Sequence, residues 1–145
     1  MRIPQCLISF AMVVTLAAGL ATLAQGQQRN DTLQVQARID RSVRLQREAL
    51  ENLNDPARAE ELVRQAYREL SAAQSAMIIN ASGMRFPDPL LDLNNRKASE
   101  ALLHLQRAED TLTSNRKAPS GDPYIDGVRR NLERALRLTR LVLVL

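Results

Sequence analysis

Apolar residues recur at intervals of three and four positions along most of the chain, which is the period of an α-helix. The clearest run lies in the middle of the chain and consists of Ala59, Val63, Ala66, Leu70, Ala73 and Met77. Two later runs have the same spacing: Leu91, Ala98, Leu102, Leu105, Ala108 and Leu112, then Ile125, Val128, Leu132, Ala135, Leu138 and Val142. The pattern predicts an all-α fold with helices over residues 32–53, 56–82, 89–114 and 123–145.

The first of these helices has a weaker apolar face than the others. That face consists of Ile39, Val43, Leu50 and Leu53. Gln46 interrupts it, which breaks the apolar spacing at its centre. Charges of alternating sign stand four residues apart on another face, at Asp40, Arg44 and Glu48. We expect that second face to be exposed to solvent.

The dipeptide Asp-Pro starts three of the four predicted helices, at residues 55–56, 88–89 and 122–123. Aspartate is a good N-cap because its carboxylate accepts from amides of the first turn, and proline fits the first helical position. A period of about 34 residues is also typical of repeats that contain two helices each. Each Asp-Pro here precedes one long unbroken segment, so the dipeptides are helix caps. Four long helices with short loops predict an up-down-up-down four-helix bundle.

The first 26 residues have the composition of a secretory signal peptide. Arg2 precedes an uncharged apolar segment, Cys6 to Ala24, and small residues at Ala24 and Gly26 suit signal peptidase. We therefore expect cleavage after Gly26, with Ala24 as an alternative end of the signal. We also expect export to a periplasmic or extracellular space, and a bundle domain over residues 27–145. A retained N-terminal membrane anchor is the alternative, because this largely apolar segment of 19 residues is long enough to span a bilayer. Cys6, the only cysteine, would leave with the signal, so the bundle would hold no disulfide.

Composition argues against several classes of function. Without Arg2 the chain has 19 Lys and Arg against 16 Asp and Glu, and few aromatic residues, which is no signature of nucleic-acid binding. His104 is the only histidine, and no partner ligands or Glu-x-x-His motif accompany it. We interpret it as an ordinary residue at the edge of a helix face. We expect no metal site, no cofactor and no enzymatic activity.

The C-terminal segment departs from the pattern of a bundle helix. It carries five arginines against Glu133 and then ends in five consecutive apolar residues, Leu141 to Leu145. We predict a partner-contact face that consists of Arg130, Arg134, Arg137, Leu141, Leu143, Val144 and Leu145. Two other interpretations stay open: an apolar helix end covered by the rest of the fold, and weak contact with an anionic membrane surface.

The sequence favours a non-enzymatic exported bundle that acts by binding another protein or a second copy of itself, as an envelope scaffold or chaperone-like module. The alternative is a bundle that carries a small ligand or cofactor between its helices. Core alanines would leave room for such a ligand, or would let the helices pack closely. These alanines are Ala59, Ala66, Ala73, Ala98, Ala108 and Ala135.

Overall fold

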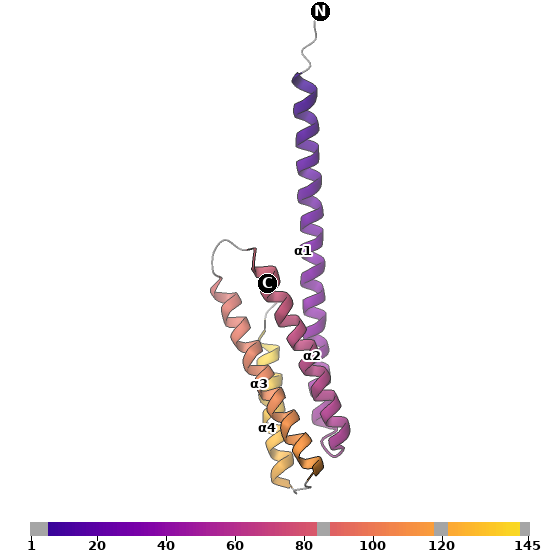
Figure 1. The fold of residues 1–145 in the computed structure, drawn as a ribbon, viewed down its shortest axis with the longest axis vertical. Coiled ribbons are helices and arrows are strands. Elements are labelled where there is room, and N and C mark those ends of the chain that lie inside the picture. The colour runs from indigo at the N-terminus through magenta and orange to yellow at the C-terminus, as the bar shows by residue number, and fades with distance from the viewer. Residues whose placement is uncertain (1–5, 84–87, 118–121, 143–145) are drawn as a thin grey trace, which may run out of the picture. The chain divides into compact units, whose positions relative to one another are not determined.

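The computed structural model describes residues 6–83, 88–117 and 122–142 (Figure 1). They form four α-helices: α1 (Cys6–Glu51), α2 (Pro56–Ala81), α3 (Pro89–Lys117) and α4 (Asp122–Arg140). The chain divides into two compact units, Met1–Leu33 and Gln34–Leu145. The second unit contains the last part of α1 and all of the other three helices.

Within the first unit, α1 is helical from Cys6 onward, whereas the sequence predicted a helix start near Thr32. The reason is the absence of any strong helix breaker. No proline follows Pro4 until Pro56, and the two glycines of the helix, Gly19 and Gly26, each cost about 1 kcal/mol relative to alanine, too little to end a helix this long. Within the described residues, no helix combines the length and apolar character needed to cross a bilayer.

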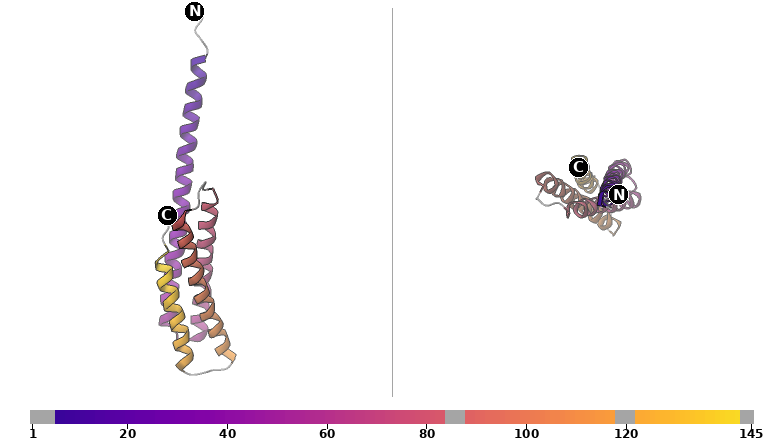
Figure 2. Two further views of the ribbon diagram at one scale, coloured as in Figure 1. Left: turned by 90° about the vertical axis from the view of Figure 1, so that its left-hand side faces the viewer. Right: turned by 90° about the horizontal axis from the view of Figure 1, so that it is seen from above.

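The second unit is an up-down-up-down four-helix bundle, as the sequence predicted (Figure 1 and Figure 2). Side-chain hydrogen bonds join each helix to the next around the bundle. They run from Ser42 of α1 to the Ala66 carbonyl of α2, from Gln74 of α2 to Ser99 of α3, between His104 of α3 and Asn131 of α4, and from Gln46 of α1 to Thr139 of α4. The α1 and α4 helices are therefore neighbours, which closes the ring.

The predicted Asp-Pro caps are confirmed where their side chains are described. The Asp55 carboxylate accepts from the backbone N–H of Arg58 at 3.1 Å, and Pro56 opens α2. The Asp88 carboxylate accepts from the backbone N–H of Leu90 at 2.9 Å, directly before α3. The third dipeptide stands at the start of α4, which begins at Asp122.

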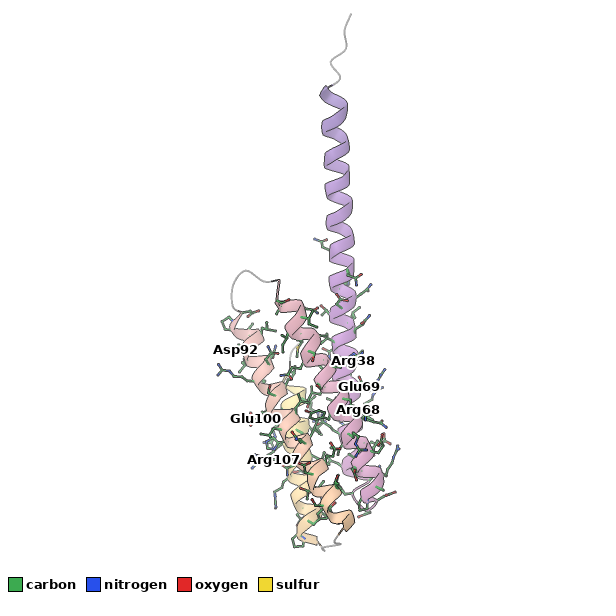
Figure 3. All side chains as sticks on the ribbon, viewed as in Figure 1. Arg38, Arg68, Glu69, Asp92, Glu100 and Arg107 are labelled. Atoms are coloured by element: carbon green, nitrogen blue, oxygen red, sulfur yellow. The ribbon has the colours of Figure 1, made fainter. Side chains whose placement is uncertain are left out.

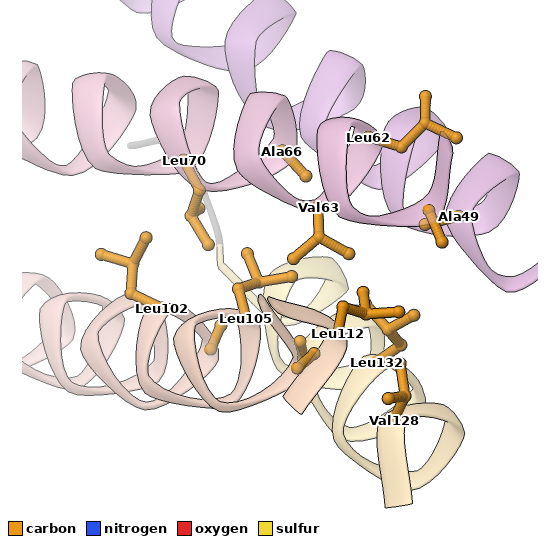
Figure 4. Packing of buried hydrophobic residues seen from close by; sticks show 14 of the residues in the cluster. Ala49, Leu62, Val63, Ala66, Leu70, Leu102, Leu105, Leu112, Val128 and Leu132 are labelled. Atoms are coloured by element: carbon orange, nitrogen blue, oxygen red, sulfur yellow. The ribbon is translucent and has the colours of Figure 1, made fainter. Parts of the chain in front are cut away.

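Leucine, valine and alanine side chains from all four helices fill the interior (Figure 4). Leu70, Leu105 and Leu132 are fully buried, and each contributes roughly 1.5–3 kcal/mol relative to an exposed position. The six alanines that the sequence placed in the core are all completely buried. All six pack within the two apolar clusters beside leucine, valine or methionine, and their small side chains let the helices approach closely.

The buried face of α1 differs from the one that the sequence predicted. Val43 and Leu50 are only partly buried, while Ser42 and Gln46 are fully buried. Ser42 Oγ donates to the Ala66 carbonyl at 2.8 Å, and Gln46 Nε2 donates to Ser42 Oγ at 3.1 Å and to Thr139 Oγ1 at 3.0 Å. The interruption at Gln46 is thus a polar layer across the core, which we call the Gln46 layer.

The described part of α4 ends earlier than the sequence predicted, at Arg140 instead of residue 145. The backbone N–H groups of Leu141 and Val142 donate to the carbonyls three residues earlier, at 3.0 and 3.2 Å, which tightens the last turn. Lys97 Nζ of α3 donates to the Leu141 carbonyl at 3.2 Å. This turn buries Val142 among Val35, Met77 and Ala98, and leaves Leu141 49 % exposed.

Candidate functional site

Charged and polar side chains that do not belong to the apolar core line the groove between α3 and α4. Asn131 of α4 donates through Nδ2 to the Gly127 carbonyl at 3.1 Å, so its Oδ1 is left to accept. His104 Nδ1 of α3 lies 3.0 Å from that oxygen and therefore donates to it. His104 is 6 % exposed, which makes it more buried than an edge position suggests.

The described residues of the predicted contact face lie together on α4 and on the residue that directly follows it, Leu141. Arg130, Arg134, Arg137 and Leu141 are spaced by four, three and four residues, which places them on one side of the helix, and all are exposed. Leu143, Val144 and Leu145 lie outside the described residues. We call the four described side chains the α4 face.

Six arginines elsewhere in the bundle are paired with carboxylates. Arg38 and Arg41 of α1 both bind Glu69 of α2, and Arg64 of α2 binds Glu109 of α3. Three further pairs are Arg58 with Glu48, Arg96 with Asp92, and Arg129 with Asp126. By contrast, the three arginines of the α4 face form no ion pair with any described residue.

Other exposed arginines without an ion pair stand in a more balanced setting. On α1, Arg44 and Arg47 are flanked on the same side of the helix by Asp40 and Glu51, all four being exposed. On α4, the exposed described side chains include five arginines but only two carboxylates, Glu133 and Asp126. Asp126 is already paired with Arg129. The α4 face is therefore the more strongly cationic of the two surfaces.

A cavity of about 230 Å³ lies in the groove beside this face. It is lined by Glu100 and His104 of α3 and by Arg134, Arg137 and Leu138 of α4. Arg107 follows His104 by one turn of α3, is exposed, and adds a further cation to this side of the molecule (Figure 3). A second hollow of about 460 Å³ is lined by residues of α1 alone, so no second helix contributes to a site there.

Exposed apolar side chains gather where the groove ends. Leu93 of α3 is 47 % exposed and stands one turn before Lys97, whose ammonium binds the Leu141 carbonyl. Leu141 itself is 49 % exposed, so two leucines lie at the same end of the groove. Ile78, Ile79 and Leu90 are also exposed near this end of the bundle, at the end of α2 and the start of α3. The cationic groove thus continues into an apolar rim.

Sequence reasoning found the α4 side of the groove and missed the α3 side. Glu100, His104 and Arg107 are spaced by four and three residues, which already placed them on one face of a helix. The missing information was which neighbouring helix that face meets.

The described residues contain no group of three or more His, Cys, Asp or Glu side chains that is able to hold a metal ion. Comparison with protein-family models, with curated proteins and with solved structures finds no match to the chain.

Proposed function

We propose that this protein is an exported, non-enzymatic helical bundle that binds an acidic protein partner through the α4 face and the adjoining groove. The observation that carries the proposal is the set of three exposed arginines on one side of α4 without any carboxylate partner among the described residues. The export part of the proposal rests on the signal-like composition of residues 1–26.

Charge complementarity selects the chemistry of the partner. A surface with three or four guanidinium groups attracts carboxylates and accelerates encounter with an acidic surface. Arginine also forms bidentate hydrogen bonds with carboxylates and is enriched at interface centres. The leucines at the end of the groove, Leu93 and Leu141, would add apolar contact area beside these charges.

A second copy of the chain is a weaker candidate for this face. A symmetric dimer places the same patch of one subunit against that of the other, so arginines would meet arginines. Like charges that face each other across an interface cost several kcal/mol, roughly. The same cations would bind an anionic membrane surface, and the experiment below separates that case.

Photo-crosslinking from single positions tests the proposal. A photoreactive amino acid is placed at position 134, 137 or 141, and at control positions 44, 47 and 68, which are exposed arginines on other helices. Cells of the native host are irradiated and the adducts are identified by mass spectrometry. We expect one acidic protein to be captured from the first three positions and not from the controls.

The other outcomes each contradict the proposal in a defined way. An adduct of twice the subunit mass would show a homodimer, and adducts with lipid would show a membrane surface. Equal capture from all six positions would show that the α4 face has no special role. A capture that persists undiminished at about 0.5 M salt would contradict the electrostatic basis of the contact.

A further inference from the structure

The cavity in the α3–α4 groove has an imbalance of charge that the fold does not resolve. Two guanidinium groups, Arg134 and Arg137, line it, and Glu100 is the one carboxylate among its lining residues. None of these three side chains forms an ion pair with a described residue, although Arg64 and Arg38 on other faces bind carboxylates of neighbouring helices. The cavity therefore offers cationic donors that remain available to a ligand.

The imidazole of His104 is fixed at the wall of this cavity. Its Nδ1 donates to Asn131 Oδ1, and the Asn131 amide is held in turn by the Gly127 carbonyl. The ring can then offer the cavity only Nε2, which becomes a donor when the imidazole is protonated. This arrangement adds an oriented and largely buried polar group to the two arginines.

We infer that this cavity binds a single carboxylate group, held by Arg134 and Arg137 with His104 as a third contact. The inference deepens the proposed function, on which it rests, because an acidic side chain of the partner would supply the carboxylate. One negative charge matches the cavity, since Glu100 already offsets one of the two guanidinium groups. Guanidinium groups recognise carboxylates through paired N–H donors in a fixed geometry.

The cavity has the size to hold a small chemical group. Pockets for drug-sized molecules and cofactors measure about 300–1,000 Å³, whereas a water molecule takes up about 30 Å³ in the liquid. A cavity of about 230 Å³ is thus too small for a typical cofactor and large enough for a carboxylate with its aliphatic stem. Leu138 supplies an apolar wall against which that stem would lie.

Because His104 is the only histidine, its ring resonances report on the cavity without interference. The isolated protein is titrated with sodium acetate at pH 6, with sodium chloride as the control for ionic strength, while the ¹³C and ¹⁵N signals of the imidazole are followed. We expect a saturable shift with a midpoint in the millimolar range, as suits so small a ligand. Arg134→Gln or Arg137→Gln should weaken binding by about tenfold, equal to about 1.4 kcal/mol.

Arg130→Gln is the matched control, because Arg130 belongs to the α4 face but does not line the cavity. It should change the acetate midpoint by less than about twofold. Circular dichroism of each variant checks that the helices are intact. A linear shift identical to that with chloride, or equal loss in all three variants, would overturn the inference.

Two further results separate this inference from the proposed function. If acetate has no effect while crosslinking from the α4 face still captures an acidic protein, the cavity is not the recognition site but the proposed function stands. If acetate binds but no partner is captured, the cavity is a site for a free carboxylate and the proposed function fails. Inorganic phosphate in a parallel titration should bind no more tightly than acetate; tighter binding would contradict the choice of a singly charged carboxylate.

Discussion

The Gln46 layer is the most unusual feature of the core at the scale of single residues. Gln46 is fully buried and donates twice through Nε2, yet its Oε1 has no hydrogen-bond partner. A buried acceptor without a partner costs about 1–3 kcal/mol of stability. Buried polar groups of this kind fix the alignment of helices in some bundles at the expense of stability.

Replacement of this glutamine by a side chain of similar shape should therefore stabilise the bundle. We expect Gln46→Met to raise the free energy of unfolding by about 1 kcal/mol, because the unpaired carbonyl oxygen is removed and the volume is kept. Ser42 and Thr139 keep their own acceptors, the carbonyls of Ala66 and Ala135. Urea unfolding followed by circular dichroism measures the change.

Gln46→Ala is the control for this substitution. It removes the same carbonyl oxygen but leaves a cavity, so it should lower the free energy of unfolding by about 1–3 kcal/mol. If Gln46→Met destabilised the protein as much as Gln46→Ala does, the unpaired oxygen would not be the source of the cost.

A second prediction at this scale concerns Glu61 on α2. The Gln65 side chain donates to its carboxylate at 2.9 Å and lowers the pKa of Glu61, with the nearby Arg64 guanidinium acting in the same direction. Because the pKa is lower in the folded chain, the stabilising contribution is present at neutral pH and is lost as the pH falls through the folded value. Glu61 is about half exposed, so solvent screens this effect.

Nuclear magnetic resonance titration of the side-chain carboxyl of Glu61 measures this directly. We expect a midpoint below the ordinary glutamate value of about 4.3, and a rise toward that value in Gln65→Ala. Glu51 is the comparison, since it is exposed and has no hydrogen bond or ion pair within the described residues. A midpoint for Glu61 that does not respond to Gln65→Ala would show that Gln65 is not the cause.

At the scale of helices, the Asp-Pro caps set where α2 and α3 begin. Asp55→Ala and Asp88→Ala each remove a carboxylate that accepts from a first-turn amide, and each should cost about 1 kcal/mol of unfolding free energy. Thermal or urea denaturation gives the value.

Asp92→Ala is the matched control for the caps. Asp92 lies in the first turn of α3 but forms only an exposed ion pair with Arg96, and its loss should cost less than about 0.5 kcal/mol. A cost for Asp92→Ala equal to that of the cap variants would contradict a specific capping role.

The sequence predicted those features of the helices that depend on neighbouring residues in the chain, and it missed those that depend on contacts with other helices. The caps and the apolar seams of α2, α3 and α4 depend on residues within a turn or two, so their positions were predicted closely. The face of α1 was predicted correctly at Ile39 and Leu53, and Leu50 packs against the core while only partly buried. The prediction was wrong at Val43, because burial of Ser42 and Gln46 in its place depends on acceptors contributed by α2 and α4. The turn that ends α4 also receives a hydrogen bond from Lys97 of α3, a tertiary contact that no local pattern reveals.

The same distinction between local pattern and contacts between helices applies to the candidate site. The α4 face was visible in the sequence because its residues share one helix. Glu100, His104 and Asn131 join the site only through the packing of α3 against α4, and their spacing alone does not say which helices meet.

At the scale of the whole molecule, stability should reside in Gln34–Leu145. Every described core residue belongs to this unit, the first being Val35. We expect a chain that begins at Gln27 and one that begins at Gln34 to differ by less than about 0.5 kcal/mol in unfolding free energy, because none of the described side chains in residues 27–33 belongs to the core. Urea unfolding of both chains checks this, and a loss of about 2 kcal/mol in the shorter chain would contradict it.

The central claim, an exported bundle that binds an acidic partner through the α4 face, is tested most directly by a native mass spectrum. The protein is purified from the envelope fraction of its own host, together with a variant that carries Arg130→Glu, Arg134→Glu and Arg137→Glu. The account predicts a chain that begins at Gln27, with one acidic protein bound, and the same chain without that protein in the variant. A chain that still carries residues 1–26, or a cleaved chain found unbound in both samples, would contradict it.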